Sequence, residues 1–388
     1  KGHVTHNAHQ KDSTVSFWSP PVVEYYLTVR TDPESITTIS GEGWYDDCTD
    51  VELMAPSYVP DEAGLNGERH MFTHWTVDGN PKAGNPITVH MNANHTAIAH
   101  YVKQCEVTFD QSGVGSDYTG TVVNVDGTDY GVGDLSVSFW WDEGSTHDFA
   151  FQSPLLVSPD AKRYMWASTS GLSTLQSGSL VVSTSGSVTG NYKTQYYLTV
   201  TSPHGSPTPT SGWFDSGTPI TASVTSPSLG PTGTRYVCTG WDGTGSVPAS
   251  GAGSSTTFTL TLPSTITWNW KTQYYLTVRT APSGIVTILG EGWHDDLTSV
   301  PLTAPSVAGY NFLNWDVDGT SQGAGVASIT VSMIEPHTAT AHYKAIAVPV
   351  GGYSVSLTQP TEITPLIGYT MILAIFGAAI TLFRRKRK

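Results

Sequence analysis

Adjacent carboxylates at two equivalent positions are the residues best suited to bind a metal ion. Asp46-Asp47 and Asp295-Asp296 each follow a Gly-Trp-aromatic step. Together with backbone carbonyls they could supply part of the six to eight oxygen ligands that Ca²⁺ takes. The alternative is a solvated turn, since the corresponding steps at Asp142 and Asp215 carry one aspartate each. Calcium is therefore a hypothesis for two turns. A paired-carboxylate hydrolase is disfavoured, because an acid and a base need different environments.

Two of the three cysteines are candidates for a disulfide. Cys48 and Cys105 are 57 residues apart, and a bond closing such a loop would contribute roughly 4 kcal/mol in the chain-entropy model. A compartment outside the cell permits the bond, although the sequence does not give the distance between the two residues. The third cysteine, Cys238, stands where related segments carry Phe72 and Phe312, so we expect a buried thiol.

Asn94-His95-Thr96 is an N-x-[ST] sequon. Glycosylation of Asn94 would need an exposed turn, and an unmodified surface turn is the alternative. Catalytic motifs do not accompany these residues: the sequence has no HExxH and no glycine-rich phosphate loop leading into a helix. We therefore predict a protein that is not an enzyme, with no catalytic residues and no cofactor other than the calcium considered above.

An uncharged segment near the carboxyl end predicts a membrane anchor. Leu366–Phe383 has 18 residues without a charge, or about 27 Å as a helix, against a hydrocarbon core of about 30 Å. Arg384, Arg385 and Lys386 begin a basic cluster that follows directly. Basic clusters stay on the cytoplasmic side, so we expect a single-pass protein in the lipid bilayer with its N-terminal part outside the cell.

The charge balance argues against a nucleic-acid partner. Lys and Arg total 18 against 32 Asp and Glu, which gives a formal net charge of −14. A nucleic-acid binder needs a basic face to meet phosphates. Gly, Pro, Trp and Tyr are abundant and few segments have a helical pattern. This composition is typical of many short strands joined by tight turns.

These residues belong to a pattern that recurs along the chain. Tyr-Tyr-Leu-Thr-Val starts at residues 25, 196 and 274, and Gly-Trp-aromatic-Asp follows at residues 43, 212 and 292. A step ending in Trp75, Trp241 or Trp315 comes next, with an Asp-Gly turn expected at residues 78, 242 and 318. A divergent copy starts at Cys105, where Trp140-Trp141-Asp142 replaces the second step. Landmarks in register predict four tandem units.

Each unit is predicted to be β. In the first, Tyr25, Leu27 and Val29 alternate with Tyr26 and Thr28, as in a strand. The repeated aromatics are expected to form small cores, and a carbohydrate-stacking platform is the alternative. The joints between units are about three residues long. Joints this short favour a stalk of roughly 130 Å without flexible linkers.

The fold class is therefore predicted as all-β, with about four small β-sandwich or β-grasp-like domains and one C-terminal transmembrane helix. The expected divisions are an N-terminal arm or interaction strand at 1–23, β-repeats at 24–104, 105–193, 194–271 and 272–346, a juxtamembrane linker at 347–365, the helix at 366–383 and a cytoplasmic tail at 384–388.

The pattern YYLTV…GWYDD…AP…FxxWxxDG…AxAHY resembles the divergent internalin B-repeat-like modules of prokaryotic surface proteins. The run from SFWWDEGSTHDFAFQSP to GNYKTQYYLTV is similar to repeats in large archaeal surface proteins with one C-terminal membrane helix. The resemblance covers about residues 24–345. It implies small β-modules in an exported spacer, adhesin or envelope protein, and it carries no catalytic residues across.

Two functions from different classes fit these observations. The first is a non-enzymatic, membrane-anchored cell-surface stalk that serves envelope structure, adhesion, or filament or S-layer-like lattice assembly, with self-association or other envelope proteins and glycans as partners. The second is an adhesin that binds glycans or cells through Trp-rich faces. An extracellular hydrolase is disfavoured because no unit has a unique polar cluster. Within the arm, Val15 and Phe17 alternate with Trp18, so Ser13–Val23 is a candidate interaction strand.

Overall fold

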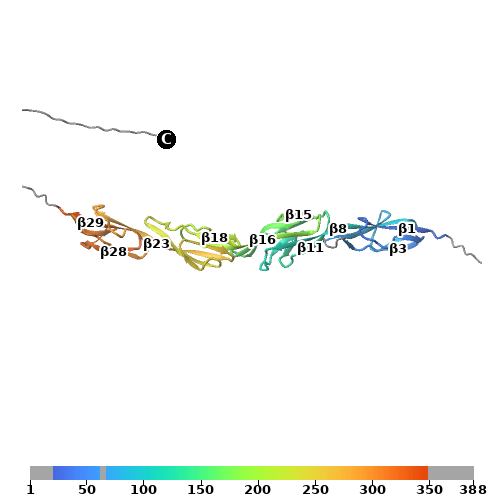
Figure 1. Cartoon of the computed structure of the whole chain (residues 1–388), viewed down its shortest axis with the longest axis horizontal. Helices are drawn as coiled ribbons and strands as arrows, with labels where there is room; N and C mark the ends of the chain where they lie inside the picture. The colour runs from blue at the N-terminus through green and yellow to red at the C-terminus, as the bar shows by residue number, and fades with distance from the viewer. Residues whose placement is uncertain (1–20, 62–66, 348–388) are drawn as a thin grey trace, which may run out of the picture.

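The computed structural model describes residues 21–61 and 67–347, and all their regular secondary structure is β. Figure 1 shows four lobes in a row, in chain order from blue to orange. Four separate hydrophobic clusters coincide with these lobes, which we call units one to four. The all-β prediction is confirmed. The predicted helix Leu366–Phe383 lies outside the described residues, within which no helix is long and apolar enough to cross a membrane.

Unit one has two layers. The larger is a mixed sheet in the order β2-β1-β8-β5, with β4 and β6 paired to successive parts of β5. The smaller is the antiparallel pair β3–β7. The strands are β1 (Glu24–Asp32), β2 (Gly43–Asp46), β3 (Thr49–Leu53), β4 (Tyr58–Pro60), β5 (Glu68–Val77), β6 (Asn80–Lys82), β7 (Ile87–Met91) and β8 (His95–Ser112).

Unit two repeats the larger sheet as β11-β8-β16-β14, with β13 beside β14. Its second layer has four strands in the order β10-β9-β12-β15. The strands are β9 (Thr121–Val125), β10 (Thr128–Gly131), β11 (Val137–Asp142), β12 (Thr146–Phe151), β13 (Leu155–Ser158), β14 (Lys162–Gly171), β15 (Ser177–Val181) and β16 (Gly186–Thr201). This second layer is wider than the two-stranded one of unit one.

Units three and four return to the plan of unit one. Their larger sheets are β17-β16-β23-β20 and β24-β23-β29-β26, and their smaller layers are β18–β22 and β25–β28. The strands of unit three are β17 (Gly212–Asp215), β18 (Thr218–Ser223), β19 (Ser228–Leu229), β20 (Thr234–Thr244), β21 (Ser250–Ala252), β22 (Ser255–Leu260) and β23 (Ser264–Ala281). Those of unit four are β24 (Gly292–Asp295), β25 (Thr298–Thr303), β26 (Tyr310–Val317), β27 (Thr320–Ala324), β28 (Ser328–Met333) and β29 (His337–Ala345).

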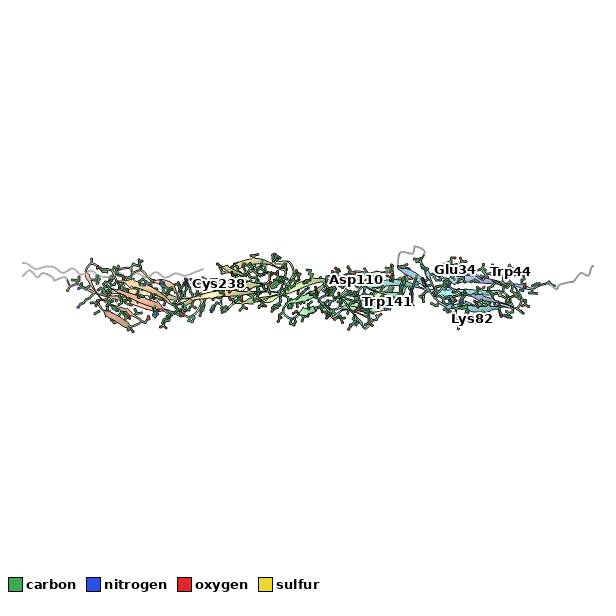
Figure 2. All side chains as sticks on the ribbon, turned by 90° about the horizontal axis from the view of Figure 1, so that it is seen from below. Glu34, Trp44, Lys82, Asp110, Trp141 and Cys238 are labelled. Atoms are coloured by element: carbon green, nitrogen blue, oxygen red, sulfur yellow. The ribbon has the colours of Figure 1, made fainter. Side chains whose placement is uncertain are left out.

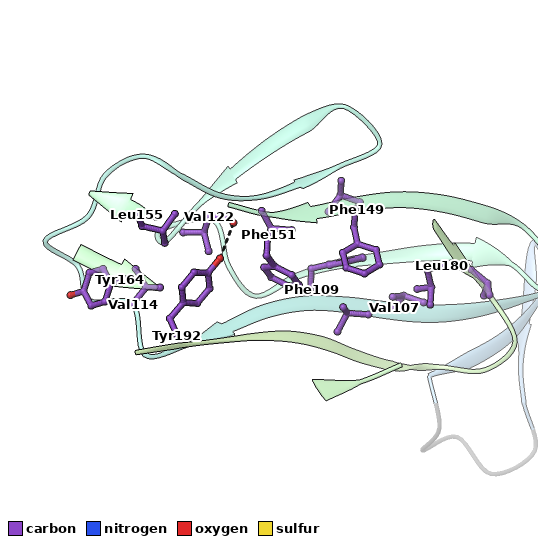
Figure 3. Packing of buried hydrophobic residues seen from close by; sticks show 14 of the residues in the cluster. Val107, Phe109, Val114, Val122, Phe149, Phe151, Leu155, Tyr164, Leu180 and Tyr192 are labelled. Carbon is purple, nitrogen blue, oxygen red and sulfur yellow. Dashed lines mark hydrogen bonds between the residues drawn. The ribbon is translucent and has the colours of Figure 1, made fainter. Parts of the chain in front are cut away.

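In units one, three and four, one repeated tryptophan lies in the core, as predicted. Trp75 and Trp315 are fully buried, and Trp241 is buried against Trp268. Unit two uses phenylalanines instead (Figure 3), and the buried Tyr192 places its hydroxyl 2.9 Å from the Gln152 carbonyl. Burial raises the pKa of that phenol. The second tryptophan of each repeat, in the Gly-Trp step, lies outside these buried sets.

Three long strands each belong to two units. In β8, Ala97, Ala99 and Tyr101 enter the core of unit one, while Cys105 and Phe109 enter that of unit two. All five occupy odd-numbered positions, with Lys103 between the two sets, so one face of a single strand serves both cores. The strands β16 and β23 do the same for the next pairs of units. The boundaries predicted after residues 104, 193 and 271 therefore fall inside continuous strands, with no linker between units.

The direction of these shared strands makes the array linear. The first and last strands of each unit pair in parallel, as β1 with β8 and β23 with β29. The chain therefore leaves a unit at the end opposite to its entry and starts the next unit without turning. Figure 1 shows the resulting rod, with unit one at one end and unit four at the other.

One expected turn is absent. Asp78-Gly79 and Asp318-Gly319 are tight turns with positive φ, as predicted. Asp242-Gly243 lies within β20 and pairs with Thr267 and Ile266 of β23. The chain turns just after β20, at Gly245 with φ +69°, so the Asp-Gly pair of unit three is wrongly predicted as a turn.

Candidate functional site: the joints between units

A chain of side-chain contacts crosses each joint next to the shared strand. At the joint of units three and four, the guanidinium of Arg235 lies 4.5 Å from the ring centre of Trp293. Its Nε donates to Gln273 Oε1 at 2.7 Å, and Gln273 Nε2 donates to Asp295 Oδ1 at 2.6 Å. Lys271 Nζ donates to the other carboxylate oxygen of Asp295 at 2.9 Å. We call this Arg–Gln–Asp–Trp arrangement the clasp.

The joint of units two and three has the same clasp. Arg163 lies 4.5 Å from the ring centre of Trp213 and donates to Gln195 at 2.8 Å. Gln195 donates to Asp215 at 2.8 Å, and Lys193 donates to the same carboxylate at 3.1 Å. In both joints the arginine comes from the earlier unit, while the aspartate and tryptophan come from the later one. The clasp therefore fixes one unit against the next.

The joint of units one and two has a variant. Arg69 lies 4.2 Å from the ring centre of Trp140 and donates to Gln104 at 2.9 Å. Gln104 donates to Asp142 at 2.9 Å. The lysine differs, since Lys103 pairs with Glu68 at 2.9 Å. The divergent Trp140-Trp141-Asp142 step thus takes the position of the Gly-Trp step, as its alignment predicts.

The main chain adds one contact to each clasp. The amide nitrogens of Glu106, Tyr197 and Tyr275 occupy the same place, the second residue of the Tyr-Tyr-Leu-Thr-Val segment. They donate to carbonyls of the preceding unit, at Gly67 (2.7 Å), Ala161 (3.0 Å) and Gly233 (2.8 Å) respectively. In unit one the corresponding donor, Tyr26 N, is satisfied by Asn94 Oδ1 of the same unit at 2.8 Å.

The clasp aspartates are stabilised in their charged form. Hydrogen bonds from Gln195 and Lys193 lower the pKa of Asp215. At Asp295, hydrogen bonds from Lys271 and Gln273 lower the pKa in the same way. These side chains are 39–62% exposed, so each ion pair contributes at most about 1 kcal/mol. The guanidinium–indole contact adds about 0.5–1 kcal/mol. The continuous strand sets the register, and we expect the clasp to restrain bending about it.

A second polar contact recurs at the Asp-Gly turns. His95 Nδ1 and Thr96 N both bond to the carboxylate of Asp78, and His337 and Thr338 do the same at Asp318. Burial raises the pKa of Asp318, but the hydrogen bonds from His337 and Thr338 N outweigh it and hold the pKa below its ordinary value. This contact holds the last strand of the unit to the turn.

The acidic residues predicted to bind calcium separate into different roles. Asp295 gives both carboxylate oxygens to the clasp. Asp46 and Asp47 are exposed at the outer end of unit one. Asp296, the counterpart of Asp47 in unit four, is exposed as well. In the described part of the chain, no three His, Cys, Asp or Glu side chains come together as a metal-binding group. Calcium binding stays a prediction, without a ligand set that supports it.

The predicted disulfide between Cys48 and Cys105 is wrong, since both thiols are free. Cys48 is exposed next to Asp46, which pairs with Glu24 at the start of unit one. Cys105 is buried in the core of unit two, ten residues along β8 from His95, the partner of Leu27. At about 3.3 Å per residue this places them roughly 40 Å apart along the rod, against the 7 Å that a disulfide allows between Cα atoms.

The other two predictions for single residues have different outcomes. Asn94 is exposed, and its Oδ1 accepts from Tyr26 N; its glycosylation stays a prediction. Cys238 is buried as predicted, with Sγ 3.5 Å from the Gly240 carbonyl. Burial raises the pKa of this thiol, which makes it a poor nucleophile.

The clasp itself is absent from the sequence-based predictions. Each of the three arginines, Arg69, Arg163 and Arg235, is 32–38 residues away from its glutamine in the sequence. Only the strand register brings each arginine opposite its glutamine. The spacing of residues around the paired aromatics does contain a signal for the clasp. Each arginine stands three residues before the aromatic or cysteine that pairs with the closing aromatic, and each glutamine stands three residues after that closing aromatic.

One comparison with known families supports the resemblance. A family described as the divergent InlB B-repeat domain matches residues 274–347, which correspond to unit four. The match starts at Tyr274, inside the shared strand β23, where the strand passes from unit three to unit four. Unit four is thus similar to a B-repeat, a surface-associated repeat module. No curated protein matches the chain.

Proposed function

We propose that this chain is a stiff, non-enzymatic stalk of the cell surface, held to the membrane by Leu366–Phe383 and the basic residues that follow. Its outer units would be carried away from the bilayer for a structural role in the envelope, in adhesion, or in filament or lattice assembly. The kinship to large archaeal surface proteins belongs to the same proposal.

One observation carries the proposal: each described joint has a shared strand and a clasp. A flexible linker would let neighbouring units reorient. Here the backbone ladder of one unit continues into the next, and an arginine of one unit is stacked on a tryptophan of the other. Such joints suit a spacer, whose reach depends on stiffness. The similarity of unit four to a surface-associated repeat supports the same reading.

Electron microscopy of single molecules tests the stalk. The chain truncated after residue 347 keeps all four cores and is expected to form straight particles with one narrow distribution of end-to-end length. Particles with freely varying angles between lobes would contradict the proposal. Membrane attachment is tested separately: the full chain should pellet with membranes after a salt wash, while the truncated chain should stay in the supernatant.

A glycan-binding adhesin is the second candidate, favoured by the exposed Trp44. The tryptophans at the equivalent positions in units two to four lie under arginines, so the face that each turns toward its arginine is not free for a sugar ring. Binding to a glycan array that is lost in Trp44→Ala would support this candidate. The absence of binding would exclude it and would not affect the stalk proposal.

A further inference from the structure

The outer end of unit one carries half of a clasp. Trp44 packs edge-on against Tyr26 at 5.2 Å and 68°, which matches Tyr197–Trp213 at 5.2 Å and 72°. Trp213 lies under Arg163, whereas Trp44 is 62% exposed. Figure 2 shows Trp44 near the end of the rod. The same ring in the same setting is therefore covered at the joints and open here.

Two carboxylates flank this open ring. Glu24 pairs directly with Asp46 across β1 and β2, at the position where the joints pair a glutamine with an aspartate. Like charges placed opposite each other on neighbouring strands are destabilising. Within the described residues, neither carboxylate has a cationic partner. The face is therefore more acidic than the joints, and a positive group between the two carboxylates would relieve the repulsion.

The joints show which positive group fits. In each of them a guanidinium lies 4.2–4.5 Å from the equivalent indole and donates to the glutamine of the cross-strand pair beside it. Tyr26 N is already satisfied by Asn94, so the open half needs only the side-chain partner. Val22 and Val23, which are 65% and 52% exposed, lie next to it on the chain and add apolar surface.

We propose that the face formed by Glu24, Trp44 and Asp46 binds an arginine side chain presented by a β-domain of another protein. The guanidinium would stack on Trp44, as Arg163 and Arg235 stack on their tryptophans inside the rod, and it would donate to the two carboxylates where those arginines donate to a glutamine. The proposal does not depend on membrane anchoring or on the stalk's role.

End-to-end binding of a second copy through unit four does not fit this chemistry. Phe312 pairs with Tyr343, as Phe72 pairs with Tyr101, so the arginine position of unit four is three residues earlier, at Gly309. The glutamine position is Ile346, whose amide donates to the Gly309 carbonyl. Unit four thus offers neither the guanidinium nor the glutamine side chain of a clasp, so the arginine is not supplied by unit four of a second copy.

Fluorine NMR can test the face with a small probe. The full chain, labelled with 5-fluorotryptophan and held in detergent, would be titrated with N-acetyl-arginine amide, and the Trp44 signal assigned from Trp44→Phe. We expect the Trp44 signal to shift saturably, with a dissociation constant about fivefold lower than for the neutral citrulline derivative. The Trp213 and Trp293 signals should stay in place, because arginines already cover those rings.

Matched variants separate this site from general charge effects. Glu24→Gln with Asp46→Asn should weaken arginine binding to the level of citrulline, while Glu34→Gln with Glu52→Gln, the same charge change elsewhere on unit one, should leave it unchanged. Equal shifts for arginine and citrulline, or a shift in both variant proteins alike, would overturn the proposal. So would a Trp44 signal that responds only after residues 1–20 are deleted, since the chain's own segment would then occupy the face.

Discussion

Replacing the clasp arginine between units two and three should loosen the first edge strand of unit three. Arg163→Ala removes a guanidinium–indole contact of about 0.5–1 kcal/mol and a hydrogen bond from a charged donor to Gln195, worth about 1–1.5 kcal/mol at this partly exposed site. The sum is about 2 kcal/mol, or roughly thirtyfold in an opening equilibrium. Among the strands that the structure describes, β17 pairs only with β16, and it carries Trp213, so β17 should be destabilised most directly.

Hydrogen exchange followed by mass spectrometry would measure this effect. Amides of β17 should exchange roughly ten- to thirtyfold faster in Arg163→Ala, while those of β25 and β28 in unit four stay unchanged. Arg279→Ala is the matched control, because Arg279 is exposed and belongs to no clasp. If β17 exchanged at the same rate in both variants, the clasp would not hold the units together and the reasoning would fail.

Three further predictions concern single residues. The lowered pKa of Asp318 means that its stabilising contribution is complete above the ordinary carboxyl pKa and is lost as the pH falls through the lowered value. Urea unfolding of unit four should therefore become easier in acid, and Asp318→Asn should flatten that dependence. Trp315→Ala, at a fully buried position, should cost about 3–5 kcal/mol and unfold unit four first, as seen by exchange in β25 and β28. A thiol reagent should modify Cys48 in the native protein and leave Cys105 and Cys238 unmodified. If the reagent modified none of the three cysteines, the result would favour the Cys48–Cys105 disulfide instead.

The sequence was most informative where a signal is local. Alternation identifies strands such as β1, and the aromatic steps identify the core residues Trp75 and Trp315, because one short segment contains both the period and the buried group. The register of the four copies also located the divergent unit. Its wider second layer was not evident, since β9 and β10 have no counterpart in the other copies.

The two tryptophans of each repeat show where sequence reasoning stops. Both recur with the same regularity, yet Trp315 fills a core and Trp293 lies in a joint. The difference depends on Arg235, which is far from Trp293 in sequence and meets it only through the pairing of β20 with β23. The disulfide prediction failed for a related reason: Cys105 lies on a strand that runs out of unit one.

The distance between neighbouring units tests the central claim most directly. Spin labels at Val181→Cys in unit two and Leu262→Cys in unit three, in a Cys48→Ser background, would sit at exposed positions on either side of a joint. Double electron–electron resonance on the full chain should give one narrow distance distribution, which broadens in Arg163→Ala. A broad distribution in the unmodified joint would contradict a stiff rod built from shared strands.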